Sequence, residues 1–247
     1  MDNPALDAHT HCGLTVPFDD LSQEWVLGAI QGGVAFSPVE KVYDRYNPYF
    51  TDSDGYRHSR RRVHDYLLEL GSAKNIFPFF FIWNDFAPIP DSFVGIKWHR
   101  HPDEPVYLYE STQCRTKIDE ICDKRLPITL EEEFANTINF VRMISGRTVV
   151  IIPHMGWLNG GYYKLKKTGI FENEMVWVDT ALASRQEIED FAEAYGVRRM
   201  MFGSDYPFGI PSSEKRKVMQ CLSGEDLALV LSGNLLKLLG KSLDVPH

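Results

Sequence analysis

The sequence predicts a single (β/α)8 barrel, in which eight parallel strands close on themselves inside a ring of helices. Apolar segments of strand length alternate with segments of helical period along the whole chain. The strand-like segments are almost continuously apolar, as strands buried on both faces must be. An open doubly wound sheet is the alternative. It is disfavoured because no glycine-rich phosphate-binding turn follows the first strand-like segment.

Eight segments have the composition of buried strands. They are residues 5–11, 34–36, 77–83, 93–99, 126–130, 148–153, 175–178 and 200–203. Strands that alternate with helices are typical of a parallel sheet. No linker, change of composition or low-complexity segment divides the chain. We therefore predict one domain over residues 1–247.

The helices are predicted from apolar residues spaced three and four apart and from their end signals. We expect them near residues 22–30, 63–70, 115–123, 134–144 and 188–195, and further helices over residues 213–239. Gly71 should end the second of them as a C-cap. Ser184 and Glu187 have the spacing of a capping box, in which each side chain satisfies a free amide at the helix start. The segment 39–59 should be a long irregular loop.

The composition is that of an ordinary globular protein, with 44% hydrophobic and 24% charged residues. The net charge of −8 disfavours non-specific binding to nucleic acid or membranes, so a small-molecule substrate is the expected partner. There is no apolar run of membrane-spanning length and no signal-peptide pattern. The four cysteines are scattered without metal-ribbon spacing, which favours a cytoplasmic protein with reduced thiols. A homodimer is possible, since such barrels often pair.

The first strand ends in His9 and His11, which are two residues apart and so point to the same side. Neutral imidazole is the commonest metal ligand in proteins. Cys12 follows directly and is expected to be a small buried residue rather than a ligand. Asp7 precedes His9 by two positions and could be a buried hydrogen-bond acceptor behind the histidines.

Polar side chains also end most of the other strands, and the active site of such a barrel lies at the carboxyl ends of its strands. These residues are Asn84 and Asp85, Lys97 to His101, Glu131 to Glu133, His154, Asp179 and Thr180, and Ser204 and Asp205. Histidines and carboxylates gathered at one rim could hold one or two divalent cations and move protons.

Five pieces of the chain, in order, resemble the amidohydrolase superfamily. They are residues 6–11, 95–99, 152–156, 202–207 and 232–239, and the Gly-Ser-Asp-Tyr-Pro piece at 203–207 is the most specific. The resemblance is to the amidohydrolase-related (amidohydrolase 2) branch, which includes aminocarboxymuconate-semialdehyde decarboxylase and pyrone-dicarboxylate lactonase. These are metal-dependent TIM-barrel hydrolases and decarboxylases.

The resemblance implies a role for each matching residue. His9 and His11 would be metal ligands, and Asp205 would be a ligand and the base that takes a proton from the attacking water. His154 would be a ligand to a second metal or an acid/base group. The implied cofactor is a divalent metal, with Zn²⁺ expected first and Mn²⁺, Fe²⁺ or Mg²⁺ open.

One position departs from the family pattern, in which the fifth strand usually ends in histidine. Here Glu131 stands at that place, and Glu132 competes with it because the register is uncertain by one. Glutamate can still bind or bridge cations and favours harder ones such as manganese or magnesium. Alternatively, the metal has been lost, or the carboxylates only favour the start of a helix.

Further residues are candidates for substrate binding. Lys97 and His99 share one face of the fourth strand, and Trp83, Asn84 and Trp157 would line the pocket of a barrel. The basic cluster at 57–62 follows a tyrosine-rich loop and could supply an arginine that clamps a substrate carboxylate. For most of these arginines a solvated helix face is the simpler interpretation.

The leading hypothesis is a metal-dependent hydrolase that cleaves a small ester, lactone or amide with a metal-activated water. The alternatives are a non-oxidative decarboxylase of a small carboxylate and a non-catalytic barrel with a degenerate metal site. The identity of the substrate depends on the loops that line the pocket and does not follow from the fold.

Overall fold

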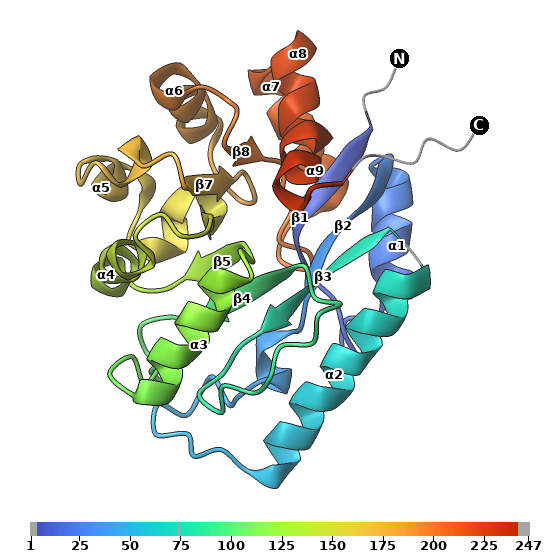
Figure 1. Cartoon of the computed structure of the whole chain (residues 1–247). Coiled ribbons are helices and arrows are strands. Elements are labelled where there is room, and N and C mark those ends of the chain that lie inside the picture. The colour runs from blue at the N-terminus through green and yellow to red at the C-terminus, as the bar shows by residue number, and fades with distance from the viewer. Residues whose placement is uncertain (1–3, 74, 242–247) are drawn as a thin grey trace.

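The computed structural model describes residues 4–73 and 75–241, and it confirms the single (β/α)8 barrel (Figure 1). Eight strands lie side by side in sequence order, and each pairs in parallel with the next. They are β1 (Ala5–His11), β2 (Ile30–Phe36), β3 (Ile76–Phe81), β4 (Gly95–His99), β5 (Ile128–Glu131), β6 (Val150–Ile152), β7 (Val176–Asp179) and β8 (Met200–Met201).

Backbone hydrogen bonds between β1 and the segment that follows β8 bring the first and last strands together. The amide of Ala8 donates to the carbonyl of Phe202, and the amide of His11 donates to the carbonyl of Tyr206, both at 2.8 Å. Between them, the amide of Asp205 donates to the carbonyl of His9, also at 2.8 Å. The contact that closes the barrel therefore also sets Asp205 beside the two histidines of β1.

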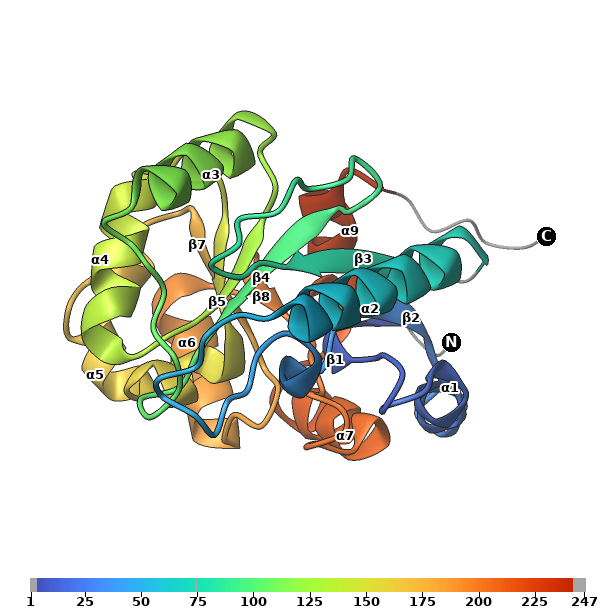
Figure 2. The same ribbon diagram turned by 90° about the horizontal axis from the view of Figure 1, so that it is seen from below.

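Helices surround the strands, as the view from below shows (Figure 2). The α-helices are α1 (Phe18–Leu27), α2 (Asp54–Ala73), α3 (Thr112–Asp123), α4 (Phe134–Ile144), α5 (Tyr162–Lys166), α6 (Arg185–Tyr195), α7 (Pro211–Cys221), α8 (Gly224–Ala228) and α9 (Asn234–Leu239). Short 3₁₀ turns lie at η1 (Val39–Lys41), η2 (Pro153–Asn159) and η3 (Ile170–Glu172), and a π-helical turn, η4 (Leu229–Gly233), joins α8 to α9. The capping box of Ser184 and Glu187 is present at the start of α6.

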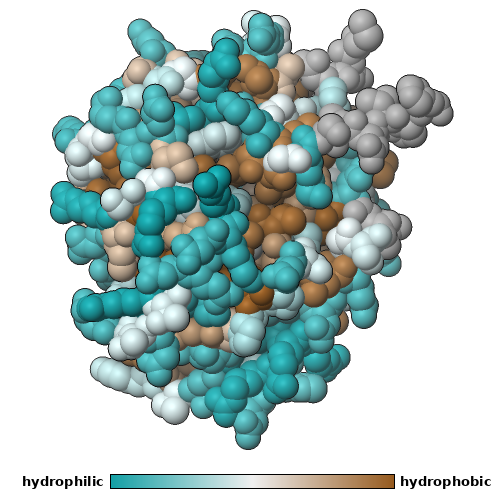
Figure 3. Space-filling model, viewed as in Figure 1, coloured by the Kyte–Doolittle hydropathy of each residue, from teal (hydrophilic) through white to brown (hydrophobic). Residues whose placement is uncertain are grey.

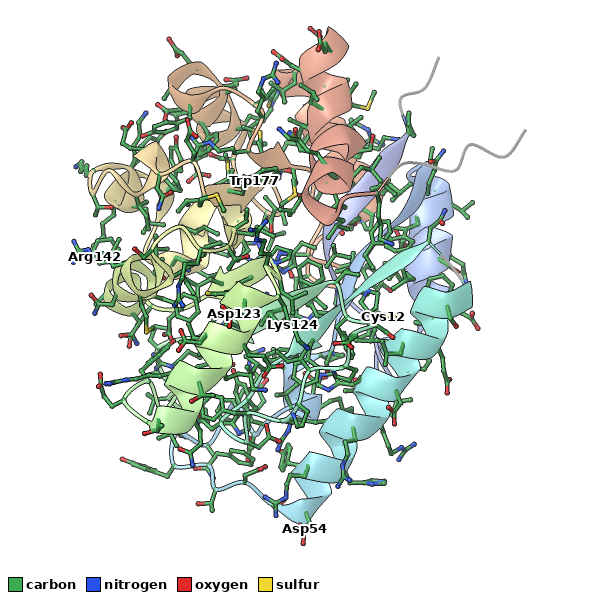
Figure 4. The ribbon with its side chains drawn as sticks, viewed as in Figure 1. Cys12, Asp54, Asp123, Lys124, Arg142 and Trp177 are labelled. Atoms are coloured by element: carbon green, nitrogen blue, oxygen red, sulfur yellow. The ribbon has the colours of Figure 1, made fainter. Side chains whose placement is uncertain are left out.

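The hydrophobic core has two parts, as a barrel requires. The larger cluster lies between the strands and the helices, and the smaller one is built mainly from strand residues such as Leu6, Phe79 and Met201. Trp177, labelled near β7 in Figure 4, belongs to the smaller cluster. Cys12 is fully buried inside the molecule, as expected, whereas Asp54 lies at its edge where α2 begins (Figure 4).

The second strand is longer than predicted, because it begins at Ile30 rather than at residue 34, and helix α1 precedes it as Phe18–Leu27 rather than 22–30. Gly32 and Gly33 hid the start of the strand, since glycine has a low strand propensity. Glycine is needed there for space: a Cβ at Gly33 would lie 2.1 Å from the carbonyl oxygen of Asp7 on β1.

Helix α2 is also longer than predicted. It begins at Asp54, inside the segment expected to be an irregular loop, and it continues through Gly71 to Ala73. The prediction that Gly71 ends the helix is wrong. A Cβ there would lie 3.1 Å from Cδ of Pro78 on β3, so this glycine lets the helix approach the barrel.

The face of the molecule seen in Figure 3 is mostly hydrophilic, with hydrophobic residues gathered near its centre. None of the helices in the described part of the chain has the length and hydropathy of a membrane-spanning segment.

Candidate active site

Two histidine nitrogens converge on one carboxylate oxygen at the carboxyl end of the barrel. Nε2 of His9 lies 3.3 Å from Oδ1 of Asp205, and Nε2 of His11 lies 3.4 Å from the same oxygen. All three side chains are almost completely buried. The predicted trio of His9, His11 and Asp205 is thus brought together with its ligand atoms pointing inward, in an arrangement that could hold a metal ion.

The hydrogen bonds of the other ring nitrogens favour the tautomer that metal binding needs. Nδ1 of His9 lies 2.8 Å from Oδ2 of Asp179, and Nδ1 of His11 lies 3.3 Å from the carbonyl oxygen of Ser37. A ring that binds a cation would donate its Nδ1 proton to this acceptor and present its Nε2 lone pair to the cation. Burial, and then the charge of Lys97, lowers the pKa of His9 to about 4, so this imidazole stays neutral.

His154 lies on the other side of Asp205. Its Nε2 is 3.9 Å from Oδ2 of Asp205 and 3.6 Å from Oε2 of Glu131, while its Nδ1 lies 3.2 Å from the carbonyl oxygen of Ala181. Burial disfavours the charged ring, but the contact with Glu131 and the charges of Asp205 and Asp179 outweigh it and raise the pKa of His154 to about 9.

The backbone is in the left-handed region at both His154 (φ 55°) and Asp205 (φ 57°). For residues other than glycine this conformation costs about 1–3 kcal/mol and is concentrated at functional sites. Burial raises the pKa of Asp205, but the hydrogen bond with His11 and the neighbouring imidazoles lower it to about 2. Asp205 is therefore a carboxylate at neutral pH and can act as a ligand or a base.

Glu131, also predicted as a metal ligand, lies in a different cluster. Its Oε2 accepts a hydrogen bond from Nζ of Lys97 at 2.9 Å, and Nζ also lies 3.4 Å from Nε2 of His9. Lys97 is fully buried and stands between the two clusters. It was predicted to bind substrate, and in the structure its Nζ contacts these candidate ligands.

The other oxygen of Glu131 faces two histidines at the end of β4. Its Oε1 lies 3.0 Å from Nε2 of His99 and 2.5 Å from Nε2 of His101. Burial raises the pKa of Glu131, but the charges of His99 and Lys97 and the contacts with His101 and His154 hold it well below its usual range. Burial lowers the pKa of His99 to about 4.

The structure also decides which glutamate faces the site. Glu132 is turned away from it, where it accepts hydrogen bonds from Arg100 at 2.8 Å and from the hydroxyl of Tyr109 at 2.5 Å. Glu131 is therefore the carboxylate directed inward.

A cavity of about 540 Å³ opens over these groups. It is lined by His11, Val39, Arg45, His99, His101, Glu131, Trp157, Leu158, Leu182, Asp205 and Phe208. His99 and Trp157, which were predicted to bind substrate, thus line the cavity. Apolar side chains with a few charged groups are typical of a site for a small organic molecule.

Two predicted pocket residues, Trp83 and Asn84, are outside that lining. Trp83 is buried and stacks on Tyr43 with ring centroids 4.1 Å apart. The side-chain amide of Asn84 donates a hydrogen bond to the carbonyl of Val106 and accepts one from the amide of Leu108, so it joins two loops. Both follow the last residue of β3 by two or three positions, where the chain has already left the barrel wall.

The arginine cluster at 57–62 does not line this cavity. Arg60 is buried and pairs with Asp52 at 2.7 Å and Asp85 at 2.6 Å. The arginine at the cavity is Arg45, from the loop after β2, which pairs with Glu104 at 2.5 Å. Sequence reasoning missed Arg45, although its place in a loop after a strand was a usable signal.

Two buried carboxylates support the histidines from behind. Asp7 accepts hydrogen bonds from the amides of His9 at 3.2 Å and Ser204 at 2.9 Å, so it is the buried acceptor that was expected, with backbone donors. Asp179 holds the ring of His9 through Oδ2 and the amide of His154 at 2.9 Å through Oδ1. This role of Asp179 was not predicted.

Comparison with known proteins agrees with the fold. The Amidohydrolase family model matches residues 139–241, a range that contains His154, Asp179 and Asp205. No curated protein sequence matches the chain.

The barrel resembles many solved structures at low sequence identity. The 2,6-dihydroxybenzoate decarboxylase from Rhizobium has a TM-score of 0.72 and 15% identity, over 97% of this chain and 99% of that one. A putative 2-pyrone-4,6-dicarboxylic acid hydrolase from Pseudomonas putida has a TM-score of 0.67 and 14% identity, over 99% and 100%. A zinc-bound amidohydrolase from Burkholderia multivorans has a TM-score of 0.68 and 13% identity, over 97% and 100%.

These likenesses in structure show the fold, and the family match adds the carboxyl-terminal motifs. The chain thus has the (β/α)8 fold of these proteins, and its residues 139–241 resemble the Amidohydrolase family.

Proposed function

We propose that the protein is a metal-dependent hydrolase that cleaves a small ester, lactone or amide, with a divalent cation held by His9, His11 and Asp205. The observation that carries this proposal is the convergence of two imidazole Nε2 atoms on one carboxylate oxygen, at 3.3 and 3.4 Å. Two nitrogens and one carboxylate oxygen form a donor set that suits Zn²⁺, and Mn²⁺ or Fe²⁺ also accept it. The zinc-bound structural relative agrees with zinc as the first candidate.

A bound divalent cation would supply Lewis acidity, which lowers the pKa of water to about 7 and polarises a carbonyl group. Asp205 has two oxygens with different surroundings: Oδ1 faces His9 and His11, and Oδ2 faces His154. The Oδ2 atom is thus placed to accept a proton from an attacking water. His154 can give a proton from Nε2 to the leaving group, since its Nδ1 is engaged with a backbone carbonyl.

The rest of the cavity suits a small substrate. Val39, Leu158, Leu182 and Phe208 offer apolar surface for its body. Trp157, which is 57% exposed, lies at the mouth, where it could cover a bound molecule. The side chains of His9, His154 and Asp205 are almost completely buried, which strengthens the electrostatic interactions among them.

A non-oxidative decarboxylase is the second candidate. It is supported by the position of His154, whose Nε2 lies 3.9 Å from Oδ2 of Asp205 and could carry the proton for the carbon atom that loses CO₂. Solved structures with this fold include decarboxylases of dihydroxybenzoate and carboxyvanillate. Both reactions would use the same cation and the same pocket, so the products distinguish them.

The test is a product assay on the zinc-loaded and the manganese-loaded protein, with activated esters, small lactones and hydroxylated aromatic carboxylates. Hydrolysis that Asp205→Asn reduces by at least 10²-fold supports the hydrolase. The matched control is Asp54→Asn, because the Asp54 side chain is 99% exposed on helix α2. Release of CO₂ instead selects the decarboxylase. Turnover that persists in Asp205→Asn overturns both, and no turnover of any substrate class favours the non-catalytic barrel.

A further inference from the structure

Strand β4 ends in a second His-x-His pair, which faces the same cavity as the pair on β1. His99 is the last residue of β4, and His101 follows it by two positions. We propose that His99, His101 and Glu131 form a second divalent-cation site, separate from that of His9, His11 and Asp205. The two sets share no residue, so the second site does not depend on the first.

The ligand atoms of this second set converge. Oε1 of Glu131 lies 3.0 Å from Nε2 of His99 and 2.5 Å from Nε2 of His101. The two imidazole rings are 4.6 Å apart between centroids. Small shifts would open this cluster into a coordination sphere with two nitrogens and one oxygen, a donor set that suits zinc and Fe²⁺.

A carboxylate on the far side of the two imidazoles supports the interpretation of this cluster as a metal site. The oxygens of Glu104 lie 3.7 Å from Nδ1 of His99 and 3.6 Å from Nδ1 of His101. Histidines that bind metals usually donate their remaining ring N–H to such a carboxylate, which directs the other nitrogen to the cation. At the first site Asp179 contacts Nδ1 of His9 more closely, at 2.8 Å, whereas the contacts of Glu104 are longer than a hydrogen bond. Glu104 itself is held by the hydroxyl of Tyr43 at 2.7 Å.

One contact would have to change when the cation binds. Nη2 of Arg45 lies 3.0 Å from Nδ1 of His101. Because a guanidinium group can only donate, Nδ1 of His101 must carry no proton in this contact. A ligating His101 carries its proton on Nδ1, so Arg45 would then pair with Glu104 alone, at the existing contact of 2.5 Å. The Arg45 side chain is 19% exposed at the cavity and has room for this adjustment.

Lys97 keeps the two sites apart. Its Nζ holds Oε2 of Glu131 at 2.9 Å and also contacts His9, which leaves only Oε1 of Glu131 for the second cation. Glu131 is therefore a ligand of the second site and not a bridge between the two. Because His99, His101 and Glu131 all line the cavity, a cation there would retain an open position for an oxygen of the substrate.

The test is the number of zinc ions bound per chain, measured by elemental mass spectrometry after stripping with a chelator, loading with zinc and desalting. We expect about two zinc ions in the wild-type protein, about one in His101→Ala and about one in His11→Ala. His58→Ala is the matched control, since His58 is exposed on helix α2. Circular dichroism and the melting temperature of each variant establish that it is folded. Glu104→Gln should weaken the second zinc by 10–100-fold in a chelator competition and leave the first unchanged.

The outcomes separate this inference from the proposed function. One zinc that is lost in His11→Ala and kept in His101→Ala overturns the second site and leaves the first intact. One zinc that is lost in His101→Ala and kept in His11→Ala supports the second site and contradicts the first. If His101→Ala does not fold, His99→Gln takes its place, and an undiminished zinc content in that variant also overturns the inference.

Discussion

Asp179 accepts a hydrogen bond from Nδ1 of His9 at 2.8 Å, with both side chains fully buried. This contact fixes the tautomer of His9 and aims Nε2 at Asp205. The other oxygen of Asp179 accepts the amide protons of His154 at 2.9 Å and Ala181 at 3.1 Å, so one carboxylate orients the ring of His9 and the backbone at His154. Burial opposes its charge, but the contacts with His9 lower the pKa of Asp179, and the carboxylate stays ionised.

Asp179→Asn should therefore weaken zinc binding at the first site by about 10–100-fold, since such carboxylates orient metal-binding histidines and raise their basicity. A chelator competition measures the change in the zinc dissociation constant. Asp91→Asn is the control, because the Asp91 side chain is 94% exposed. Unchanged zinc affinity in Asp179→Asn would show that His9 is not a ligand or does not need this support.

His64 should make stability depend on pH. It is buried on helix α2, and its Nε2 accepts the amide proton of Phe81 at 3.3 Å. Burial, and then the charge of Arg60, lowers the pKa of His64 from 6.5 to about 3. Because the folded-state pKa lies below the unfolded value, the unfolded state binds more protons between the two, and stability is lost as pH falls below about 6.5.

We expect the free energy of unfolding to fall more steeply with acidification in the wild type than in His64→Gln, whose amide oxygen can keep the bond to Phe81. Between pH 7 and pH 5 the wild type should lose about 2 kcal/mol more of its free energy of unfolding than His64→Gln, at about 1.4 kcal/mol per pH unit. Urea denaturation at the two pH values measures it, with His58→Gln on the exposed face of the same helix as the control. The same pH dependence of the free energy of unfolding in the wild type and His64→Gln would contradict the lowered pKa of His64.

Gly95, the first residue of β4, should tolerate no side chain. A Cβ there would lie 2.4–2.6 Å from ring atoms of Phe79, a buried residue of the neighbouring strand β3. Gly95→Ala should lower the free energy of unfolding by about 1–3 kcal/mol, because the ring cannot move without disturbing the core.

Gly55→Ala provides the comparison for Gly95→Ala. Gly55 is exposed in the first turn of α2, and its nearest neighbour would be 3.7 Å from the new Cβ. The substitution should leave stability unchanged or raise it by up to about 1 kcal/mol through helix propensity. Both values come from urea denaturation, and equal stability of the two variants would contradict this account of the packing.

The sequence predicted the barrel well because the evidence for it is local. The apolar strands and the capping box of Ser184 and Glu187 each depend on neighbours in the sequence. The boundaries of β2 and α2 were wrong where Gly33 and Gly71 allow two elements to come close. Such spatial needs arise between distant segments and leave no periodic pattern.

The candidate site was likewise predictable where it depends on local patterns and not where it depends on contacts between distant segments. The rule that the active site lies at the carboxyl ends of the strands, together with the family resemblance, selected His9, His11, His154 and Asp205, whose side chains lie close together in the structure. It could not show that Lys97 turns inward to Glu131, since the direction of a side chain beyond a strand end depends on the loops packed around it. For the same reason Trp83 was predicted at the pocket and lies outside its lining.

The most direct test of the account is the zinc content of His11→Ala beside that of His58→Ala, both loaded and desalted in the same way as the wild type. The account predicts that His11→Ala loses about one zinc per chain relative to the wild type and that His58→Ala loses none, because His11 directs Nε2 at Asp205 from 3.4 Å and His58 is exposed on α2. Equal zinc content in His11→Ala and the wild type, or no zinc in the wild type after loading, would contradict the metal centre at His9, His11 and Asp205.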